Sequence, residues 1–457
     1  MSELPNGWAE ARLTEIIDLH DSRRIPLNKE QRQQRQGPYP YYGANGLVDH
    51  INGYLFDGDY VLLAEDGGYF DDPARGVAYE ASGKFWVNNH AHILSPRGDI
   101  PNRFLTHLLN SISWLPHVGG STRLKLTQAG MQQIPVPVPP LSEQRRIVAK
   151  LDSLRARSAR ARHELNRVPK VIERYKQAIL AKAFSGVLTE EWRTIYGVAL
   201  HTSYSASGID GRIASELPEL PEAWAWTSVD QAAVVTGGLT KNSKRSEIPS
   251  RAKYLRVANV YSNELRLDDI AEIGCTTAEL SKTRLADGDL LIVEGNGSLD
   301  QIGRVALWGG QISDCSHQNH IIRARPLPST VPKYGLYWLL SPIGRTAIER
   351  VASSSSGLHT LSISKVSALP IPMCIEEEQA EIVRRIDLAF AWLDKIVAEH
   401  ARAEHLLPKL DQAILAKAFR GELVPQDPND EPAPVLLERI KAEGAGADQP
   451  GRRRARA

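Results

Sequence analysis

The sequence predicts an α+β fold in which two compact, strand-rich blocks are separated by two long helices, with the block-and-helix unit present twice. The octamer QAILAKAF occurs at residues 177–184 and again, unchanged, at 412–419. Each octamer ends a stretch whose apolar residues recur in steps of three and four, the pattern of a helix with one apolar seam. The regions before these stretches contain short β-branched and aromatic runs punctuated by Gly, Asp and Asn, which is typical of strands and turns.

Length and composition indicate a folded protein of two or three domains. The 457 residues are 42% apolar and 24% charged, with a formal net charge of +1, which neither requires nor excludes a nucleic-acid partner. Three well-separated cysteines fit no zinc spacing and indicate a reducing compartment. No apolar run approaches the ~18 residues that a membrane span needs, so we expect a cytoplasmic protein without membrane contact.

The repeat extends well upstream of the octamer. Held at an offset of 235, IPVPVPPLSEQRRIVAKLDSL from Ile134 lies over LPIPMCIEEEQAEIVRRIDLA from Leu369 without gaps. A shorter repeated motif, Leu-Pro-x-x-Trp, begins each half of the chain at Leu4 and Leu220, at an offset of 216. The C-terminal part of each unit is therefore constant, and its N-terminal part varies in length.

Each constant part is predicted to form a long helix that follows a proline-rich, extended segment. Ser142 is the expected N-cap of the first helix, and Gly186 and Gly421 are the expected ends. Pro169 and Pro408 predict a kink or restart in each helix. The apolar register includes Tyr175 and Leu410. The residues expected to form the pairing seam are Leu151, Leu154, Leu165, Ile172 and Ile179 in the first helix, and Ile386, Leu393, Ile396, Leu407 and Ile414 in the second.

The two helices carry opposite charge. Residues 143–176 contain eleven Lys/Arg and four Asp/Glu, a net charge of +7, whereas residues 378–411 contain five and seven, a net charge of −2. Opposite charges favour pairing of the helices as an intramolecular coiled coil. Two solvated helix faces that never meet are the alternative.

These observations predict six segments. The first block spans 1–140 and is followed by a helix at 141–187 and a linker at 188–219. The second block spans 220–375 and is followed by a helix at 376–424 and a tail at 425–457 that includes the short helical piece PVLLERIKAE.

No catalytic motif or cofactor site is evident. The sequence contains no G-x-x-x-x-G-K-[ST] phosphate loop and no Asn/Asp-Pro-Pro-Tyr/Phe motif of amino-methyltransferases. Two histidine pairs, His90-x-His92 and His317-x-x-His320, lack companion ligands at zinc spacing, so we expect no metal. A nuclease-like cluster is conceivable from Asp71, Asp72, Glu80 and Lys84.

DNA recognition fits the polar segments better. Residues 241–256, KNSKRSEIPSRAKYLR, hold six basic residues and one Glu. Asn bonds well to adenine and Arg to guanine, and Lys suits phosphate. Turn residues or solvated charges are the alternative for each position. The candidates for DNA contact are Asn45, Lys84, Asn88, Asn89, His90, Arg123 and Lys125 in the first block, and Lys241, Asn242, Lys244, Arg245, Asn296, Ser298, Gln318, Asn319 and His320 in the second.

Over essentially its whole length, the chain resembles the specificity subunits of type I restriction-modification systems. The resemblance rests on PVPPLSEQRRIV from Pro137, its partner EEEQAEIVRRID from Glu376, the paired QAILAKAF-x-G-x-L ends, TEEW at Thr189 and the Leu-Pro-x-x-Trp openings. Segments such as YPYYGANGLVDHINGYLFDGDYVLLAEDGG and YLRVANVYSNELRLDDI also look like the family's target-recognition domains. Two departures are MCIEEE before the second helix and His400 at a seam position.

The resemblance implies two target-recognition domains, related by a pseudo-twofold axis, at opposite ends of an antiparallel coiled coil of two conserved helices. Each domain would read one half of a bipartite site in double-stranded DNA, and the helices would set the spacing. The subunit would be non-catalytic and would carry no cofactor. It would bind two modification (methyltransferase) subunits and, through them, the ATP-dependent restriction subunits.

Two other interpretations stay open. One is a DNA-binding nuclease or another enzyme whose active site has no recognisable motif. The other is a protein in which the two blocks bind protein or RNA.

Overall fold

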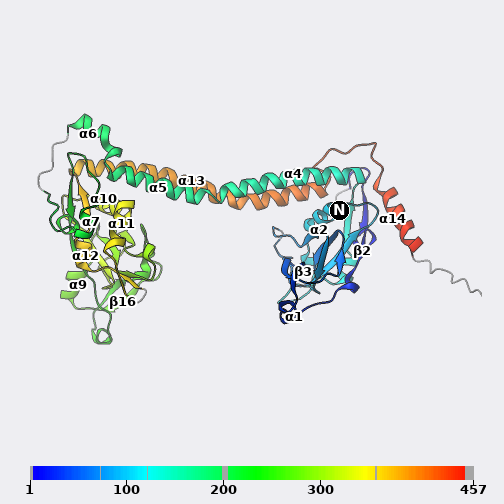
Figure 1. Cartoon of the computed structure of the whole chain (residues 1–457), viewed down its shortest axis with the longest axis horizontal. Helices are drawn as coiled ribbons and strands as arrows, with labels where there is room; N and C mark the ends of the chain where they lie inside the picture. Colours follow the sequence, from blue (N-terminus) through cyan, green and yellow to red (C-terminus); the bar gives the residue numbers. More distant parts are fainter. Residues whose placement is uncertain (1–3, 73, 121, 198–203, 356–357, 448–457) are drawn as a thin grey trace, which may run out of the picture. The chain divides into compact units, whose positions relative to one another are not determined.

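The computed structural model describes residues 4–72, 74–120, 122–197, 204–355 and 358–447, and the chain divides into two compact units (Figure 1). Unit 1 comprises Met1–Asn166 and His400–Ala457, and unit 2 comprises Arg167–Glu399. The long helix α13 (Glu376–Phe419) therefore contributes residues 376–399 to unit 2 and residues 400–419 to unit 1.

Unit 1 is built on two four-stranded sheets, ordered β2-β9-β6-β7 and β4-β3-β8-β5, and on the pair β1-β10. Strand β3 pairs in parallel with β8, with Tyr41 opposite Trp86. The strands are β1 (Ala9–Arg12), β2 (Ile17–Leu19), β3 (Gln36–Gly43), β4 (Gly46–Ile51), β5 (Phe56–Asp57), β6 (Tyr60–Ala64), β7 (Ala78–Ala81), β8 (Lys84–Val87), β9 (Ala91–Pro96) and β10 (Pro135–Val138).

The main core of unit 1 lies where α2 meets the sheet and the long helices. Apolar residues recur along α2 at helical spacing, so Phe104 and Leu108 are fully buried on one face. They belong to the same cluster as Leu63 of β6, Ile147 of α4 and Leu415 of α13. The helices of this unit are α1 (Lys29–Gln33), α2 (Asn102–Ser111), α3 (Gln128–Gln132), α4 (Leu141–Leu165), the C-terminal part of α13 and α14 (Ala433–Ala447).

Unit 2 contains a four-stranded sheet ordered β12-β21-β17-β19 and a three-stranded sheet ordered β16-β13-β20, in which β13 and β20 are parallel. The pairs β11-β24 and β14-β15 and the small sheet β18-β23-β22 complete it. The strands are β11 (Ala225–Ser228), β12 (Ala233–Thr236), β13 (Arg251–Leu255), β14 (Val260–Tyr261), β15 (Glu264–Leu265), β16 (Ala271–Gly274), β17 (Leu290–Val293), β18 (Gly295–Asn296), β19 (Val305–Leu307), β20 (Ser316–His317), β21 (Ile321–Pro326), β22 (Ser353–Ser355), β23 (Leu358–Thr360) and β24 (Pro370–Met373).

The core of unit 2 packs α10 and α11 between the sheet and the long helices. Trp338 of α10, Ile348 of α11, Phe184 of α5 and Ile386 of α13 are fully buried in one cluster. The helices of this unit are α5 (Val168–Phe184), α6 (Glu190–Tyr196), α7 (Gly211–Ala214), α8 (Val229–Ala232), α9 (Thr277–Thr283), α10 (Pro332–Leu340), α11 (Pro342–Val351), α12 (Ile363–Ser367) and the N-terminal part of α13.

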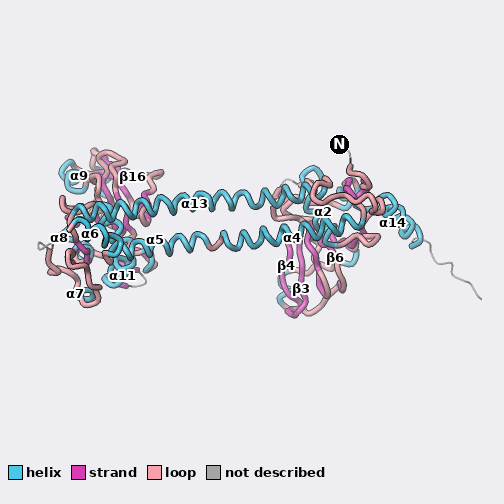
Figure 2. The backbone as a smooth tube through the Cα atoms, turned by 90° about the horizontal axis from the view of Figure 1, so that it is seen from above, coloured by secondary structure: helices cyan, strands magenta, loops and turns pink. Residues whose placement is uncertain are grey.

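In each unit a basic helix lies beside a part of α13 that runs in the opposite direction (Figures 1 and 2). In unit 1, Arg162 of α4 forms an ion pair with Asp411. In unit 2, Nζ of Lys176 in α5 lies 3.5 Å from Oδ1 of Asp394. Both pairs join a cation of the first helix to a carboxylate of the second, so the prediction that the oppositely charged helices contact each other is confirmed.

Prolines act differently in the two helices. The first helix restarts, because α4 ends at Leu165 and α5 begins at Val168 with Pro169 in its first turn, where a missing backbone N–H costs nothing. Pro408 instead lies inside the unbroken α13, so of the predicted kink or restart the restart does not occur there. Ser142 is not an N-cap, since α4 already begins at Leu141 after Pro140.

The ten predicted seam residues are all buried or partly buried. The register does not hold everywhere, because Tyr175 and Leu410 are 58% and 51% exposed. The last turns of the helices instead pack against the globular parts: Leu180 and Phe184 in unit 2, and Leu415 and Ala418 in unit 1. A strict seven-residue repeat of buried residues is therefore interrupted at Tyr175 and Leu410.

Each helix ends at the predicted glycine. Gly186 and Gly421 both adopt a left-handed conformation, with φ of +80° and +74°, which favours glycine after a helix C-terminus. A Cβ atom at Gly186 would collide with Pro221, and one at Gly421 would collide with Pro5. Both prolines belong to the Leu-Pro-x-x-Trp openings, so the end of a long helix lies directly against the opening segment of a globular part.

The tryptophans of the same openings bind the first turns of the long helices. The indole N–H of Trp8 donates to Oε2 of Glu143 at 3.0 Å, and that of Trp224 donates to Oε2 of Glu378 at 2.9 Å. Both carboxylates are almost fully buried, and burial raises the pKa of Glu143. Glu378 also accepts hydrogen bonds from Thr189 and Arg193.

None of the described helices is long and apolar enough to cross a membrane. The three cysteines, Cys275, Cys315 and Cys374, are buried and free of disulfides.

Replacing Ile386 by alanine tests the packing of α13. The side chain is fully buried in the core of unit 2, so its truncation should cost about 2–4 kcal/mol of unfolding free energy. The matched control is Leu388→Ala on the same helix, because Leu388 is 60% exposed and should change stability by less than about 0.5 kcal/mol. Equal losses in urea unfolding of the two variants would contradict the assigned packing.

Candidate nucleic-acid interface

In unit 1, three loops meet at the segment 65–67, directly after β6. The backbone N–H of Glu65 donates to the carbonyl of His90 at 2.8 Å, and its own carbonyl accepts from the N–H of Leu126 at 2.7 Å. Gly67 donates to the carbonyl of Leu124 at 3.0 Å. The loop before β9 and the loop before α3 are therefore both attached to this segment.

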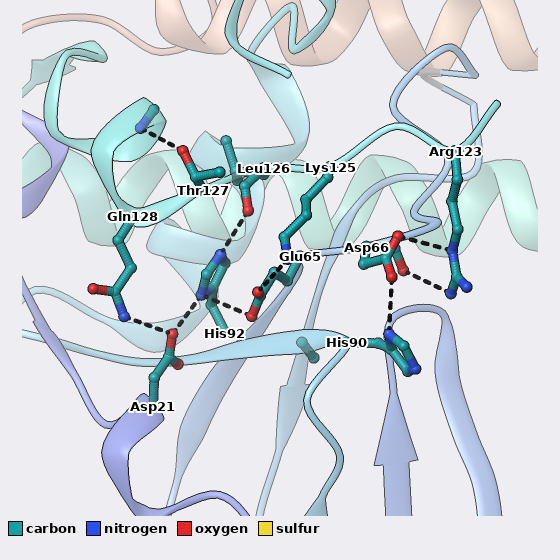
Figure 3. A network of polar contacts seen from close by, with 12 residues as sticks. Asp21, Glu65, Asp66, His90, His92, Arg123, Lys125, Leu126, Thr127 and Gln128 are labelled. Atoms are coloured by element: carbon teal, nitrogen blue, oxygen red, sulfur yellow. Dashed lines mark hydrogen bonds and ion pairs between the residues drawn. The ribbon is translucent and has the colours of Figure 1, made fainter. Parts of the chain in front are cut away.

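Two neighbouring carboxylates contact basic side chains and a histidine of these loops (Figure 3). Oδ1 of Asp66 lies 2.8 Å from Nε of Arg123, and its Oδ2 lies 3.2 Å from Nδ1 of His90. Oε1 of Glu65 lies 3.5 Å from Nζ of Lys125. Lys125 and Arg123 are more than half exposed, so this cluster faces solvent.

A buried polar network lies beneath the exposed cluster (Figure 3). Nδ1 of His92 contacts Oδ2 of Asp21 at 2.5 Å, and its Nε2 contacts the carbonyl of Leu126 at 3.2 Å. Both ring nitrogens of His92 therefore face oxygen atoms that accept hydrogen bonds. Arg24 joins Asp21 to Glu65, at 3.2 Å and 2.6 Å.

The ionised form of Asp21 is stabilised in this network. Burial raises the pKa of the carboxyl, but the hydrogen bond from His92, the charge of His92, the backbone N–H of Ile93 and Arg24 together lower it below its usual value. The network therefore stabilises a buried carboxylate and attaches β2 and β9 to the loops that carry the exposed cluster.

Asp21, Glu65 and His92 place potential metal-ligand atoms within 4.8 Å of one another. The guanidinium of Arg24 already lies against both carboxylates, and a bound divalent cation would be repelled by it. The residues thus fit an internal ion-pair network better than a metal site. His90 and His92 do not converge, because they bind Asp66 and Asp21 respectively.

Most of the predicted DNA-contacting residues of the first block lie around the segment 65–67. The Nδ2 group of Asn45 donates to the carbonyl of Gly67 at 3.0 Å. Oδ1 of Asn88 accepts from the backbone of His90 at 2.8 Å, and Asn89 between them is exposed. Lys84 lies apart, at the other end of β8, with Nζ 4.7 Å from the centre of the Tyr54 ring.

The corresponding loops of unit 2 meet after β17. Glu294 donates its N–H to the carbonyl of His320 at 2.9 Å and accepts from Leu361 at 2.7 Å. The Glu294 carboxylate also contacts Nδ1 of His320 at 2.8 Å. Gln318 and Asn319 precede this histidine, and Asn319 donates its backbone N–H to the carbonyl of Leu239 at 3.0 Å.

The basic segment of unit 2 follows Leu239. Lys241, Asn242 and Lys244 are exposed. Arg245 has an internal role, because it donates to the carbonyls of Thr240 and Gly274 and pairs with Glu279.

A small sheet carries two further candidates of unit 2. Asn296 lies on β18 opposite His359 of β23, and the exposed Ser298 follows it.

Sequence inspection missed the acidic centre of each loop cluster and the serine-rich hairpin of β22 and β23. Glu65 and Asp66 follow a strongly apolar strand, and a turn residue is the ordinary interpretation of such a position. At the repeat offset of 235, residues 353–360 of the hairpin align with residues 118–125, the segment that carries Arg123. That alignment was the available signal for the hairpin.

The conceivable nuclease cluster does not assemble in the described residues. Glu80 pairs with Arg103 at 3.1 Å, and Asp72 pairs with Arg75 at 3.5 Å. Lys84 lies near Tyr54. These carboxylates therefore take part in separate surface ion pairs.

Replacing Asp21 by asparagine tests the buried network. Removing a charged hydrogen-bond acceptor should cost about 1–3 kcal/mol at neutral pH. Because the pKa of Asp21 is lowered by folding, its contribution is present above the ordinary carboxyl pKa and is lost as pH falls through the folded-state pKa. The difference in thermal stability between wild type and variant should therefore shrink below about pH 4.

The matched control is Asp18→Asn, because Asp18 also forms an ion pair with an arginine but its side chain is 49% exposed. This variant should change stability little at any pH. A pH-independent difference for Asp21→Asn would show that the carboxylate is not the stabilising form.

Comparison with known proteins finds chains that are similar in sequence. The family described as "Type I restriction modification DNA specificity domain" matches residues 5–170. The specificity subunit of the type I restriction enzyme EcoKI from Escherichia coli K12 is 29% identical over 97% of each chain, and that of EcoDI from Escherichia coli is 28% identical over 97% of each.

Solved structures share the fold. A chain from a study of complex assembly and conformational transition of the type I R-M system aligns with a TM-score of 0.63 at 19% identity, covering 93% of this chain and all of that one. The HsdS subunit from Thermoanaerobacter tengcongensis aligns with a TM-score of 0.56 at 19% identity, covering 92% of this chain and 98% of that one. Over 97% of its length the chain is therefore similar to specificity subunits of type I restriction-modification systems, and its residues 5–170 match the DNA specificity domain of that family.

Proposed function

We propose that the chain is the non-catalytic component of a type I complex and that each unit reads one half of a bipartite site in double-stranded DNA. The observation that carries the proposal is a shared loop arrangement with different side chains. Glu65 and Glu294 each donate a backbone hydrogen bond to a histidine carbonyl, and each accepts one from a leucine, Leu126 or Leu361. The polar residues displayed around these shared bonds differ between the units, as two different half-sites require.

We further propose that the units are copies of one duplicated segment, related by a pseudo-twofold axis, and that the long helices form an antiparallel coiled coil that sets the spacing between the half-sites. Equivalent Trp-to-Glu hydrogen bonds at Trp8 and Trp224 support the duplication. The target-recognition domains would comprise 1–140 and 220–375, with helices at 141–187 and 376–424, a linker at 188–219 and a tail at 425–457.

The partners in this proposal are two modification subunits, which bind the long helices, and restriction subunits, which join through them. Exposed apolar side chains on α13 support docking. Leu388 and Trp392 are each 60% exposed in unit 2, and Leu406 and Leu410 are 58% and 51% exposed in unit 1. Residues four apart lie on one helix face, and such apolar pairs favour a protein partner. The complex would work in the cytoplasm, where its DNA substrate lies.

Mapping methylated bases in the DNA of cells that carry the system tests the function. A specificity subunit should produce one bipartite motif with a fixed gap. Replacing residues 1–140 with the corresponding block of a relative should change one part of the motif only. Inserting four residues after Leu154 should alter the gap or abolish assembly. An unchanged motif in both variants would contradict the proposal, and cleavage or methylation by the purified chain alone would favour the enzyme alternative.

The docking proposal predicts the effect of charge on the exposed face of α13. The double variant Leu388→Glu and Trp392→Glu should lose co-purification with the modification subunit, because a charge would be buried in an apolar contact. Its thermal stability should stay near that of wild type, since both side chains are exposed. The control Val397→Glu places the same charge on an exposed position of α13 that lies nine residues after Leu388, on the opposite side of the helix, and should retain the partner. Full binding by the double variant would exclude this face.

A further inference from the structure

The ion pair between Asp66 and Arg123 has a fixed geometry at the solvent-exposed surface of unit 1. Nε of Arg123 donates to Oδ1 of Asp66 at 2.8 Å, and Nη2 donates to the backbone carbonyl of Asp66 at 3.4 Å. The side chain of Arg123 is 57% exposed and that of Asp66 is 23% exposed. Two contacts from one residue orient the guanidinium without covering it.

These contacts leave several hydrogen-bonding groups of Arg123 and Asp66 available to a ligand. A guanidinium has five N–H donors in a planar fork, and the contacts to Asp66 use Nε and one hydrogen of Nη2. In the part of the chain that the structure describes, the outer edge formed by Nη1 and Nη2 has no protein partner. Oδ2 of Asp66 contacts His90 at 3.2 Å and retains a second lone pair. The pair therefore presents a two-donor fork beside an acceptor.

This arrangement is complementary to the major-groove edge of a G·C base pair. Guanine offers two acceptors, N7 and O6, which suit an arginine fork, and cytosine offers the N4 amino donor, which suits a carboxylate. We propose that Arg123 and Asp66 are specificity-determining residues through which unit 1 reads one G·C pair, with Arg123 on the guanine and Asp66 on the cytosine. This inference rests on the proposed function of unit 1 in reading DNA.

A phosphate-contacting role fits these residues less well. Affinity for the backbone comes from cations that neutralise phosphates. Here a carboxylate lies 2.8 Å from the guanidinium, and Glu65 lies 3.5 Å from the neighbouring Lys125. Carboxylates in these positions repel phosphate oxygens but accept hydrogen bonds from base amino groups, so they favour contact with base edges.

Unit 2 lacks both groups at the matching positions. Glu294 is placed by the same backbone hydrogen bonds as Glu65, and Leu361 by the same bond as Leu126. The residue after Glu294 is Gly295, and the residue three before Leu361 is Leu358. The G·C contact should therefore belong to the half-site of unit 1 alone.

Selection from a randomised duplex library by the full chain, assembled with its modification subunits, tests the proposal. Wild type should select a G·C pair at one position of one half-site. Arg123→Gln should shift that position toward A·T, because a glutamine amide bonds adenine N6 and N7. Asp66→Ala should reduce discrimination at the same base pair by about 10- to 100-fold. The other half-site should be unchanged in both variants.

The matched control is the ion pair between Arg97 and Asp18, which has the same 2.8 Å contact from Nε to Oδ1 and lies at the opposite end of β9 from His90. Asp18→Ala and Arg97→Gln should leave every base preference intact. Uniformly weaker binding by Arg123→Gln with unchanged base preferences would overturn the inference, because the ion pair would then only stabilise the loops. Loss of discrimination at different base pairs in the Arg123 and Asp66 variants would overturn it as well. Because Arg123 is exposed, its variant should fold even if Asp66→Ala does not. No selection of any sequence by wild type would instead overturn the proposed function itself.

Discussion

A hydrogen bond from an opening tryptophan to a buried carboxylate joins each globular part to its long helix. Trp8 binds Glu143, and Trp224 binds Glu378. A buried carboxylate is costly unless it is paired, so each helix start is constrained to lie against the strand that follows the tryptophan. That strand pairs with the proline-rich strand before the helix, β1 with β10 and β11 with β24. Strands β2 and β12, which belong to the four-stranded sheets that carry the loop clusters, follow β1 and β11 within a few residues. The position of the loop clusters therefore depends on this junction.

The two junctions differ in one respect. Glu378 accepts additional hydrogen bonds from Thr189 and Arg193, and both donors lie in the segment that follows the first octamer. In unit 1 the segment after the second octamer supplies no such donor to Oε1 of Glu143, which has no hydrogen-bond partner among the described residues. Instead Asp430 binds Arg146 of α4 at 2.6 Å. The segments after the octamers therefore make different contacts in the two units, although both lie near the start of a long helix.

The sequence was most informative where residues repeat. The octamers, the glycines after them and the Leu-Pro-x-x-Trp openings indicated both helices and their ends, because each has a local physical cause. Tyr175 and Leu410 fit the heptad pattern but are exposed, since tertiary packing at the helix ends replaces the seam.

The loops were predicted less completely. Candidate residues such as Asn45, His90 and Arg123 could be chosen by residue type, and they do lie together. Asp66, which holds two of these side chains, could not be identified, because its role depends on a contact between segments almost sixty residues apart. His92 also looked like half of a possible metal pair, whereas its buried partner Asp21 is 71 residues away. At the corresponding place of unit 2 lies Ile322, so the described part of unit 2 has no histidine there to form such a network.

We infer that recognition lies in the loops that differ between the units and that the repeated segments form the scaffold. Hydrogen–deuterium exchange of the assembled complex, with and without its DNA site, tests this inference. On DNA binding we expect slower exchange in residues 65–67, 88–92, 119–120 and 122–126 of unit 1 and in residues 239–245, 294–298 and 318–320 of unit 2, with little change near Trp8 and Trp224. Protection confined to the junctions or to the outer faces of the helices, with the loops unaffected, would contradict it.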